Sequence, residues 1–466
     1  MPAVSHPMYD QHYADGKARR QHCPRASQAE CRLAADRDVV ALVESTSQGR
    51  VPALAPLRYA RMHASPFAFF RGMAMIQAAD LAAGPDSGLR LQICGDAHLM
   101  NFGFFASPER QLVFDINDFD ETHPGPWEWD VKRLAVSLVL ASRSRGFGAG
   151  DARDAVLQLA ATYRRRLLAF SQMSQLDLWY CRVGFEELLS HAPDPAMRQQ
   201  LQKVADKARS QTQERLLPKM TESEDGALRL RDNPPVIFHL DEAGGPLAAC
   251  DDWLGADSLS KVQGMLEHYI ATLKEDRREL LRRFRLVDAA FKVVGVGSVG
   301  TRCLALLLQD DYDQPLFLQL KEARPSVLEA FTQDCVHGNQ GKRVVFGQRL
   351  MQATSDLFLG WTHSADGRHF YMRQLRDMKG APTLETFAAA EELASYGQAC
   401  AWTLARAHAK SGGCAAEIAG YLGDSDKFDQ ALADYAQAYA DQVEADYRLF
   451  DAAIQSGRLP CAAAAR

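Results

Sequence analysis

Two short segments in the first third of the chain carry residue types that can transfer a phosphoryl group. Asp96 and Asn101 stand five positions apart within 95–101 (GDAHLMN), and Asp118 follows within 117–120 (NDFD). Transfer from ATP needs a carboxylate beside the acceptor hydroxyl, an Asn that holds magnesium, and a second carboxylate that completes the metal site. We therefore expect Asp96 to be the catalytic residue and Asn101 and Asp118 to be magnesium ligands.

A glycine-rich segment and a lysine come some two hundred residues later. The residues of this segment (VGVGSVG) that we expect to lie against a nucleotide are Gly295, Gly297, Ser298 and Gly300. The apolar run 316–320 then leads directly into Lys321. Together they fit a hairpin over phosphates, followed by a nucleotide-binding lysine on a strand. A kinase presents the glycine loop and lysine first, so the order found here predicts a circularly permuted chain.

Each motif has a competing interpretation. A Gly-Asp pair is common in turns at strand ends, and the acidic run 115–121 also suits a solvated loop. The glycines alone fit a dinucleotide-binding unit, in which Glu322, about 20 residues further on, suits the ribose-binding acid. A Walker loop is excluded because Arg343 follows Gly341 and Lys342. We interpret His98 as a buried, hydrogen-bonded loop residue rather than a ligand or base.

Composition excludes several classes of protein. The 466 residues are 47% hydrophobic and 24% charged, which is ordinary for a globular chain with a core. A net charge of −6 and the lack of a long basic run predict no nucleic-acid partner and no membrane partner. The longest apolar stretch, 134–141, is far shorter than the ~20 residues of a spanning helix. Ten cysteines without a CxxC pair, and no visible secretion signal, favour a soluble cytoplasmic protein.

Hydrophobic patterning predicts helices on both sides of a β-rich segment. The expected helices are 66–83, 129–142, 152–171, 342–353, 396–409 and 430–451. The strand candidates are 89–94, 111–116, 292–294, 303–308, 316–320, 357–361 and 369–375. Residues 180–285 look mainly helical, and the polar first 50 residues look like an extension packed loosely on the body. Three strands, a helix and two strands predict a small antiparallel lobe.

The 95–101 loop resembles the Gly-Asp-x-His-x-x-Asn loop of aminoglycoside phosphotransferases and choline-kinase-like enzymes. The Asp118-Phe119 pair resembles their metal motif. Asp130, twelve residues after Asp118, is similar to the Asp at the start of the helix that those enzymes place after the metal loop. This match favours Asp118 over Asp115 as the metal ligand. It also implies that Asp130 ties the catalytic loop to a helix.

Residues 58–410 resemble a bacterial family of uncharacterised proteins, domain-of-unknown-function family 2252. The segments that carry this resemblance are 61–69, 94–98, 117–122, 125–130, 292–302 and 373–379. The family is grouped with protein-kinase-like folds, so the resemblance implies a fold more firmly than a reaction.

The resemblance also implies roles for single residues. Asp96 would be the base or would orient the acceptor, the 295–300 loop would cover the phosphates, and Lys321 would reach them. Arg373 would bind nucleotide from the 371–375 segment, which joins the lobes where adenine sits. There are two departures from the pattern. Cys94 stands where relatives often have His, which removes one structural hydrogen bond. The 342–353 helix offers no obvious Glu to pair with Lys321, and the substitutes are Gln348, Glu322 and Glu329.

The expected fold is therefore an α+β, protein-kinase-like, two-lobed and circularly permuted fold, in which a small antiparallel β lobe joins a large helical lobe. The expected parts are an N-terminal extension (1–55), a helical lobe in two pieces (56–285 and 379–466) and a β lobe (286–378). The expected function is Mg-ATP-dependent phosphoryl transfer to a small-molecule acceptor. The alternatives are a nucleotide-binding pseudokinase that acts as an interaction module, a nucleotidyl transferase, and a less favoured NAD(P)-dependent oxidoreductase.

Overall fold

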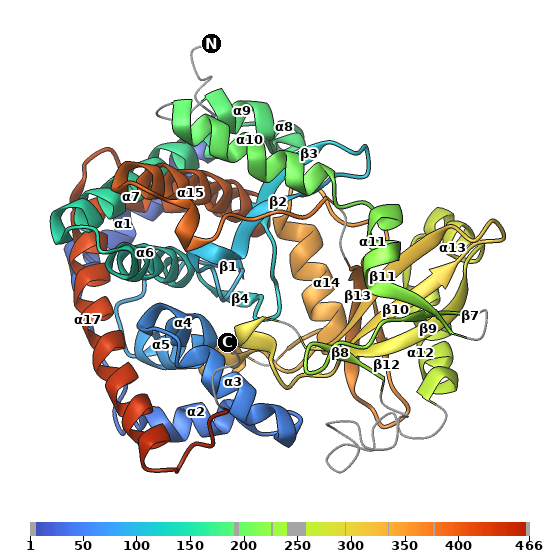
Figure 1. Cartoon of the computed structure of the whole chain (residues 1–466). Coiled ribbons are helices and arrows are strands. Elements are labelled where there is room, and N and C mark those ends of the chain that lie inside the picture. Colours follow the sequence, from blue (N-terminus) through green and yellow to red (C-terminus); the bar gives the residue numbers. More distant parts are fainter. Residues whose placement is uncertain are drawn as a thin grey trace.

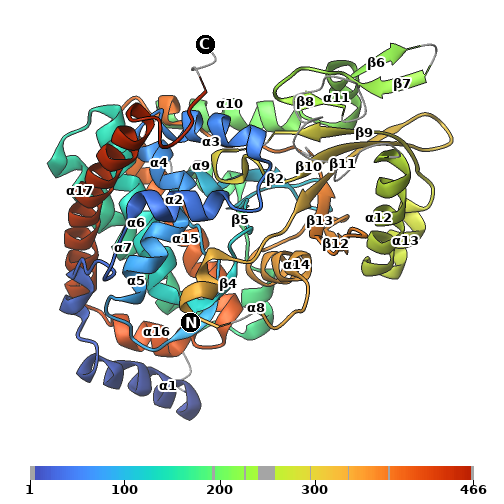
Figure 2. The ribbon, with the colours of Figure 1, turned by 90° about the horizontal axis from the view of Figure 1, so that it is seen from below.

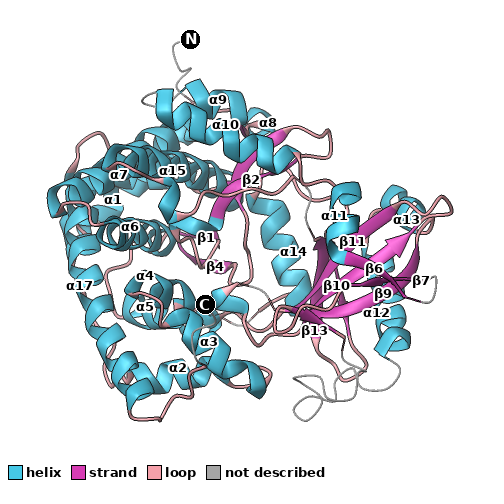
Figure 3. Ribbon diagram, in the orientation of Figure 1, coloured by secondary structure: helices cyan, strands magenta, loops and turns pink. Residues whose placement is uncertain are grey.

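The chain folds into a helical body and a six-stranded antiparallel sheet (Figure 1). The computed structural model describes residues 6–190, 195–224, 227–239, 258–293, 295–333, 335–375 and 378–462. Colouring by secondary structure shows the strands of the large sheet gathered at one side of the helices (Figure 3). The predicted α+β class with antiparallel strands is confirmed.

The large sheet has the strand order β12-β13-β11-β10-β9-β8, and every neighbouring pair is antiparallel. Its strands are β8 (Ile237–Phe238), β9 (Arg285–Lys292), β10 (Cys303–Gln309), β11 (Pro315–Glu322), β12 (Gly360–His363) and β13 (His369–Gln374). The expected strands at 303–308, 316–320 and 369–375 are therefore confirmed. Between β11 and β12 comes helix α14 (Gln340–Met351), close to the expected 342–353.

The strand expected at 292–294 is misplaced: strand β9 begins at Arg285 and ends at Lys292, Val293 lies beyond it, and residue 294 lies outside the described residues. The difference arises because Asp288 interrupts the apolar pattern of this strand. Its carboxylate accepts a 2.5 Å hydrogen bond from the Leu230 amide and lies 3.0 Å from His239 Nε2. These partners satisfy the charge beside the sheet, so the polar residue does not end the strand.

Alternation along the strands gives the sheet two different faces. Leu318 and Leu320 of β11 belong to an apolar cluster with Tyr269 of α12 (Ser258–Thr272). The alternate residues, Gln319 and Lys321, therefore lie on the opposite face of β11. In β13 the same alternation places Tyr371 and Arg373 opposite the buried Phe370 and Met372. One face of the sheet thus packs beneath α12, and the other carries these polar side chains beside a second apolar cluster that includes Leu307 and Phe317.

Four long helices form the core of the body: α6 (Trp127–Arg145), α7 (Ala149–Ser171), α15 (Ala390–Gly412) and α17 (Lys427–Gln455). Small residues let them pack closely. A Cβ added at Gly397 of α15 would lie only 2.9 Å from the Leu138 side chain of α6. The segment after residue 384 is helical, as expected, and its helices α15 and α17 pack against α6 and α7.

The first 50 residues differ from the expected loose extension. They contain α1 (Pro7–Ala18) and α2 (Val39–Ser47), and both helices pack on the body. Between them, the buried Arg37 forms ion pairs with Asp80, at 2.9 Å, and with Asp446 of α17. The segment is therefore attached to the body, in part through the buried charges that pair with Arg37.

The helix expected at 66–83 is split into α4 (Pro66–Gly72) and α5 (Ala74–Ala82). Met73 between them has φ −133° and ψ 58°, outside the helical region. The turn lets both helices face the body, because Phe69 and Ile76 are both buried in its core. The remaining helices of four turns or fewer are α3 (Ala55–Met62), α8 (Gln175–Tyr180), α9 (Phe185–Ser190), α10 (Pro195–Arg209), α11 (Gln213–Met220), α13 (Glu275–Leu281) and α16 (Ala415–Leu422).

Short strands within the body hold its two acidic loops. Strand β1 (Arg90–Ile93) pairs with β4 (His123–Pro126). Strand β2 (Phe102–Ala106) pairs with β3 (Leu112–Ile116), which also pairs with β5 (Val183–Gly184). Helix α14 contacts β1 and α15 on one side and β12 and β13 on the other, so it joins the body to the sheet (Figure 2).

A further hairpin, β6 (Thr221–Glu224) with β7 (Ala227–Leu230), lies beside β9. Among the described residues, no helix is both long enough and apolar enough to cross a membrane.

Candidate functional site

The 95–101 loop is held by a carboxylate at the start of α6. Asp130 accepts hydrogen bonds from the backbone amides of Cys94, at 2.7 Å, and Gly95, at 2.9 Å. Gly95 has φ +81°, and a Cβ there would lie 2.2 Å from the carbonyl oxygen of Glu121, so only glycine fits this turn. The predicted role of Asp130, tying the loop to a helix, is confirmed.

Two residues from distant helices fix Asp130 in turn. His408 Nε2 lies 3.1 Å from the Asp130 carboxylate, and the Tyr163 hydroxyl lies 2.8 Å from His408 Nδ1. All three side chains are buried. The Cys94 thiol donates to the carbonyl of Asp118 at 3.3 Å. This contact links the two acidic loops.

Asp96 lies in a largely buried and charged environment. Its carboxylate receives a 2.5 Å hydrogen bond from Arg133 Nε and lies 3.9 Å from His98 Nε2. Burial raises the pKa of Asp96 to about 6, although Arg133 opposes that shift. An aspartate with a raised pKa can accept a proton more readily than an ordinary one. His98 is buried, as expected, but its Nδ1 has no hydrogen-bond partner in the described part of the chain.

Asn101 and Asp118 come from different loops that are joined by backbone contacts. The Asn101 carbonyl accepts from the Asn117 amide at 2.8 Å, and the Asn101 side-chain nitrogen donates to the carbonyl of Asp96 at 2.6 Å. Asp118 is about one-third exposed. Both side chains line the same pocket. A carboxylate and an amide oxygen suit magnesium, which binds few protein ligands and keeps several waters, so this donor set fits that ion.

The structure also distinguishes Asp118 from Asp115. The Asp115 carboxylate is fully buried, accepts from Arg406 at 2.8 and 2.9 Å, and accepts from the Ala353 amide at 2.8 Å. Its lone pairs are already occupied by these donors, so it is a structural residue. Within the described ranges, no group of three or more His, Cys, Asp or Glu side chains has the geometry to hold a metal ion.

Lys321 pairs with two aspartates of the 117–120 loop. The buried ammonium contacts Asp120 directly and lies 3.8 Å from Asp118 Oδ2. Burial alone would lower the pKa of Lys321, but these two carboxylates hold it well above its usual value. The partner that the sequence left open is therefore in the acidic loop rather than in α14. Gln348 of α14, one of the residues considered as a partner for Lys321, instead donates a hydrogen bond to Gln352.

Asp120 is the point where the two parts of the molecule meet. It accepts hydrogen bonds from the Tyr371 hydroxyl, at 2.8 Å, and from Ser298 Oγ, at 3.1 Å, in addition to its contact with Lys321. Burial alone would raise its pKa, but Lys321 and Tyr371 hold it below its usual value. Sequence reasoning placed Asp120 in an acidic run without a role. The strand alternation that puts Lys321 and Tyr371 on one face was the signal that could have found it.

The glycine-rich segment is a hairpin connection between β9 and β10, not the start of a helix in a parallel sheet. Gly300 has φ +86°, and its carbonyl accepts from the Val51 amide at 2.8 Å. By contrast, a Cβ added at Gly295 would meet no atom within 4 Å. The first part of the loop thus borders open space, where a ligand can approach the backbone.

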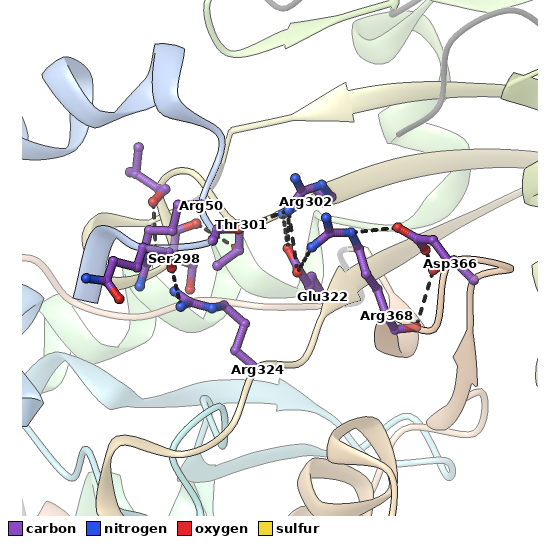
Figure 4. A network of polar contacts seen from close by, with 12 residues as sticks. Arg50, Ser298, Thr301, Arg302, Glu322, Arg324, Asp366 and Arg368 are labelled. Atoms are coloured by element: carbon purple, nitrogen blue, oxygen red, sulfur yellow. Dashed lines mark hydrogen bonds and ion pairs between the residues drawn. The ribbon is translucent and has the colours of Figure 1, made fainter. Parts of the chain in front are cut away.

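A polar network fixes the far side of this loop (Figure 4). Arg50 donates to the carbonyl of Val299 at 2.7 Å, and the Thr301 hydroxyl donates to the carbonyl of Ser298 at 2.8 Å. Arg302 and Arg368 both pair with Glu322, at 3.2 and 3.4 Å. Glu322 is therefore held by arginines and is not placed to bind a ribose, which argues against the dinucleotide interpretation.

Most of the predicted site residues line one pocket of about 300 Å³ between the body and the sheet. Of the predicted site residues, the pocket collects Asp96, Asn101, Asp118, Gly295, Gly297, Ser298, Lys321 and Arg373. Gly300 is not part of the lining; it packs behind the loop against Arg50. Lining residues without a predicted role are Arg71, His98, Asp120, Glu121, Lys292, Gln319, Leu375 and Lys379. Arg373 donates to the carbonyl of Asn117 at 3.1 Å, so it also bridges the two sides.

The fold and pocket define an α+β protein with a charged cleft between a helical body and an antiparallel sheet. Residues 50–453 match the family described as "Uncharacterized protein conserved in bacteria (DUF2252)", and the chain belongs to that family. Neither the curated proteins nor the solved structures contain a significant match to this chain.

Proposed function

We propose that the protein is a Mg-ATP-dependent phosphotransferase with a circularly permuted, protein-kinase-like fold. The observation that carries this proposal is the contact of Lys321 and Ser298, from the sheet, with Asp120, next to Asp118 in the body. It brings the lysine and glycine loop of a nucleotide site to the loop that carries the proposed metal ligand. These parts are far apart in sequence and would not meet in a dinucleotide-binding fold.

The order of elements around the sheet supports the kinase-like assignment. The segment from β9 to β13 begins with a strand (β9), the glycine loop and a second strand (β10). It continues with the strand that carries Lys321 (β11), a helix (α14) and two more strands (β12 and β13). Protein kinases likewise place a glycine-rich loop before a strand that carries the phosphate-binding lysine. In this chain the acidic loops precede that unit instead of following it. The permutation is sterically reasonable because domain termini often lie close together.

Each pocket residue has a place in this reaction. Asn101 and Asp118 would hold magnesium, which supplies charge neutralisation at the phosphates. The open backbone at Gly295 and Gly297 would lie over the phosphates, and Lys321 would bind their oxygens. Asp96 would orient the acceptor hydroxyl and take its proton. Arg133 keeps the Asp96 carboxylate in place for that task.

The first alternative is a nucleotide-binding pseudokinase. The sequence favoured it mainly because no glutamate was found to pair with Lys321. Asp120 supplies an anionic partner from another loop, so that support is weakened. Nucleotidyl transfer uses the same residue types and differs in which phosphate is attacked.

The test is a thermal-shift and transfer experiment on the full chain. We expect stabilisation by Mg-AMP-PNP but not by NAD or NADP, and a ligand at a hundredfold excess over its Kd adds about 2.7 kcal/mol. Asp118→Asn should abolish this gain, whereas the matched Asp311→Asn change at an exposed residue should preserve it. Label from γ-³²P-ATP, but not from α-³²P-ATP, should reach an acceptor in a metabolite extract. Stabilisation by NAD alone would overturn the proposal.

A further inference from the structure

The cations that line the pocket come from both sides of it. Lys321 and Arg373 belong to the sheet and already contact groups of the 117–120 loop. Arg71 is different, because it lies at the end of α4 in the helical body, on the same side as Asp96. Phosphates bound under the glycine loop would be reached by the sheet cations. Arg71 thus differs from the sheet cations because it comes from the helical body, and its backbone also borders the glycine loop, since a Cβ added at Gly297 would lie 3.7 Å from the Arg71 carbonyl oxygen.

Arg71 also differs from its neighbour Arg133 in its partners. Each of the three guanidinium nitrogens of Arg133 donates a hydrogen bond, to Asp96, to Gln77 and to the carbonyl of Phe70. Within the described part of the chain, Nε of Arg71 is buried without a hydrogen-bond partner, and the guanidinium carbon lies 5.9 Å from the centre of the Phe67 ring. A buried N–H donor without an acceptor costs free energy, which a bound anion would recover.

A second unpartnered donor lines the same side of the pocket. Nδ1 of His98 is buried and has no hydrogen-bond partner among the described residues. His98 Nε2 lies 3.9 Å from the Asp96 carboxylate, so the imidazole is next to the proposed base. Burial lowers the pKa of Arg71 and Asp96 opposes that change, which indicates that Arg71 is also near Asp96. The two open donors therefore flank the position of the acceptor hydroxyl.

We propose that the acceptor is a small anion, a hydroxyl-bearing carboxylate or phosphate monoester, held by Arg71 and His98 beside Asp96. This inference rests on the proposed phosphotransferase function. In the transfer, the acceptor hydroxyl oxygen forms a bond to the γ-phosphorus, and its proton goes to Asp96. The bond between that phosphorus and the β–γ bridging oxygen breaks, and its electron pair leaves with ADP. Arg71 neutralises the anionic end, and the uncharged His98, whose pKa burial holds well below its usual value, orients it by a hydrogen bond from Nδ1–H.

The anion-binding test uses isothermal titration calorimetry of the full chain, with and without saturating Mg-AMP-PNP. The probes are D-glycerate as the carboxylate, glycerol 3-phosphate as the phosphate monoester, glycerol as the neutral control and choline as the cationic control. We expect one or both anions to bind and the two controls not to bind. Arg71→Gln should weaken anion binding at least tenfold, whereas Arg448→Gln, at an exposed residue of α17, should not change it.

Each other outcome has a defined meaning. If neither anion binds, or if choline or glycerol binds instead, the acceptor proposal is wrong. If Arg71→Gln weakens AMP-PNP tenfold and leaves anion binding unchanged, Arg71 is a nucleotide ligand and the proposal is also wrong. Failure of AMP-PNP to bind the wild type counts against the phosphotransferase function, while Arg71-dependent anion binding in the nucleotide-free arm would still support the anion site. Circular dichroism of each variant checks that it is folded.

Discussion

Lys321 lies directly opposite Tyr371 in the register of β11 and β13, and its ammonium is 5.9 Å from the centre of the Tyr371 ring. Both side chains reach the same carboxylate, that of Asp120. This cross-strand pair therefore fixes the lysine at the pocket and ties the sheet to the acidic loop of the body. The consequences can be measured.

Asp120→Asn should loosen this junction. The variant leaves the buried Lys321 ammonium with a weaker partner, so we expect a loss of about 1–3 kcal/mol of unfolding free energy. A double-mutant cycle with Lys321→Met should show a coupling of at least about 0.5 kcal/mol, because the two residues are in contact. Urea denaturation measures both quantities. Additive effects in the cycle would show that the ion pair contributes nothing.

Asp115 and Asp118 should separate structural from ligand-binding roles. Asp115→Ala leaves the buried Arg406 without its partner, and breaking a buried pair typically costs about 3–5 kcal/mol. Asp118→Asn should change unfolding free energy by less than about 1 kcal/mol, because the side chain is one-third exposed. It should instead remove the magnesium dependence of AMP-PNP binding in calorimetry. The opposite pattern would make Asp115 the better ligand candidate.

Two glycines of the loop should respond differently to alanine. Gly300→Ala forces an alanine into φ +86° beside Arg50, so we expect destabilisation by about 1–2 kcal/mol. Gly295→Ala is the matched control, because Gly295 has φ −58° and open space at its Cβ position. Its stability should stay within about 0.5 kcal/mol of wild type. If the loop covers phosphates, Gly295→Ala should still weaken AMP-PNP binding, since the methyl group fills the space where the ligand lies.

The raised pKa of Asp96 predicts how stability depends on pH in the metal-free protein. Because the folded-state pKa, about 6, lies above the unfolded value, the folded state holds the proton more tightly. Stability should therefore fall as pH rises from about 4 through 6 and then level off. Asp96→Asn should remove this part of the slope, measured by urea denaturation in EDTA. An unchanged slope would mean that Asp96 ionises normally.

Local patterns predicted the elements near the site better than the contacts between them. The apolar runs 303–308 and 316–320 predicted strands β10 and β11 from their sequence alone. The polar residues after β1 and β3 likewise predicted loops there. Strand alternation then places Lys321 on the pocket face. The same patterns missed the buried polar residues, because Asp288 and Arg37 acquire partners only in the folded state.

Sequence patterns also could not predict the contacts that complete the site, because the residues in contact are far apart in the chain. Asp130 contacts His408, His408 contacts Tyr163, and Lys321 contacts Asp120, and each of these contacts spans about 200 residues or more. No spacing rule links residues so far apart. The search for the partner of Lys321 in α14 followed the usual kinase arrangement and missed a carboxylate that approaches from the other side of the pocket.

The central claim is that one pocket binds a metal and a nucleotide between the 95–120 loops and the glycine hairpin. A crystal structure of the full chain with AMP-PNP and magnesium tests it most directly. We predict that the phosphates lie beneath Gly295 and Gly297, within reach of Lys321, and that the metal is bound by Asn101 and Asp118. A nucleotide bound elsewhere, or a metal held without either residue, would contradict the account.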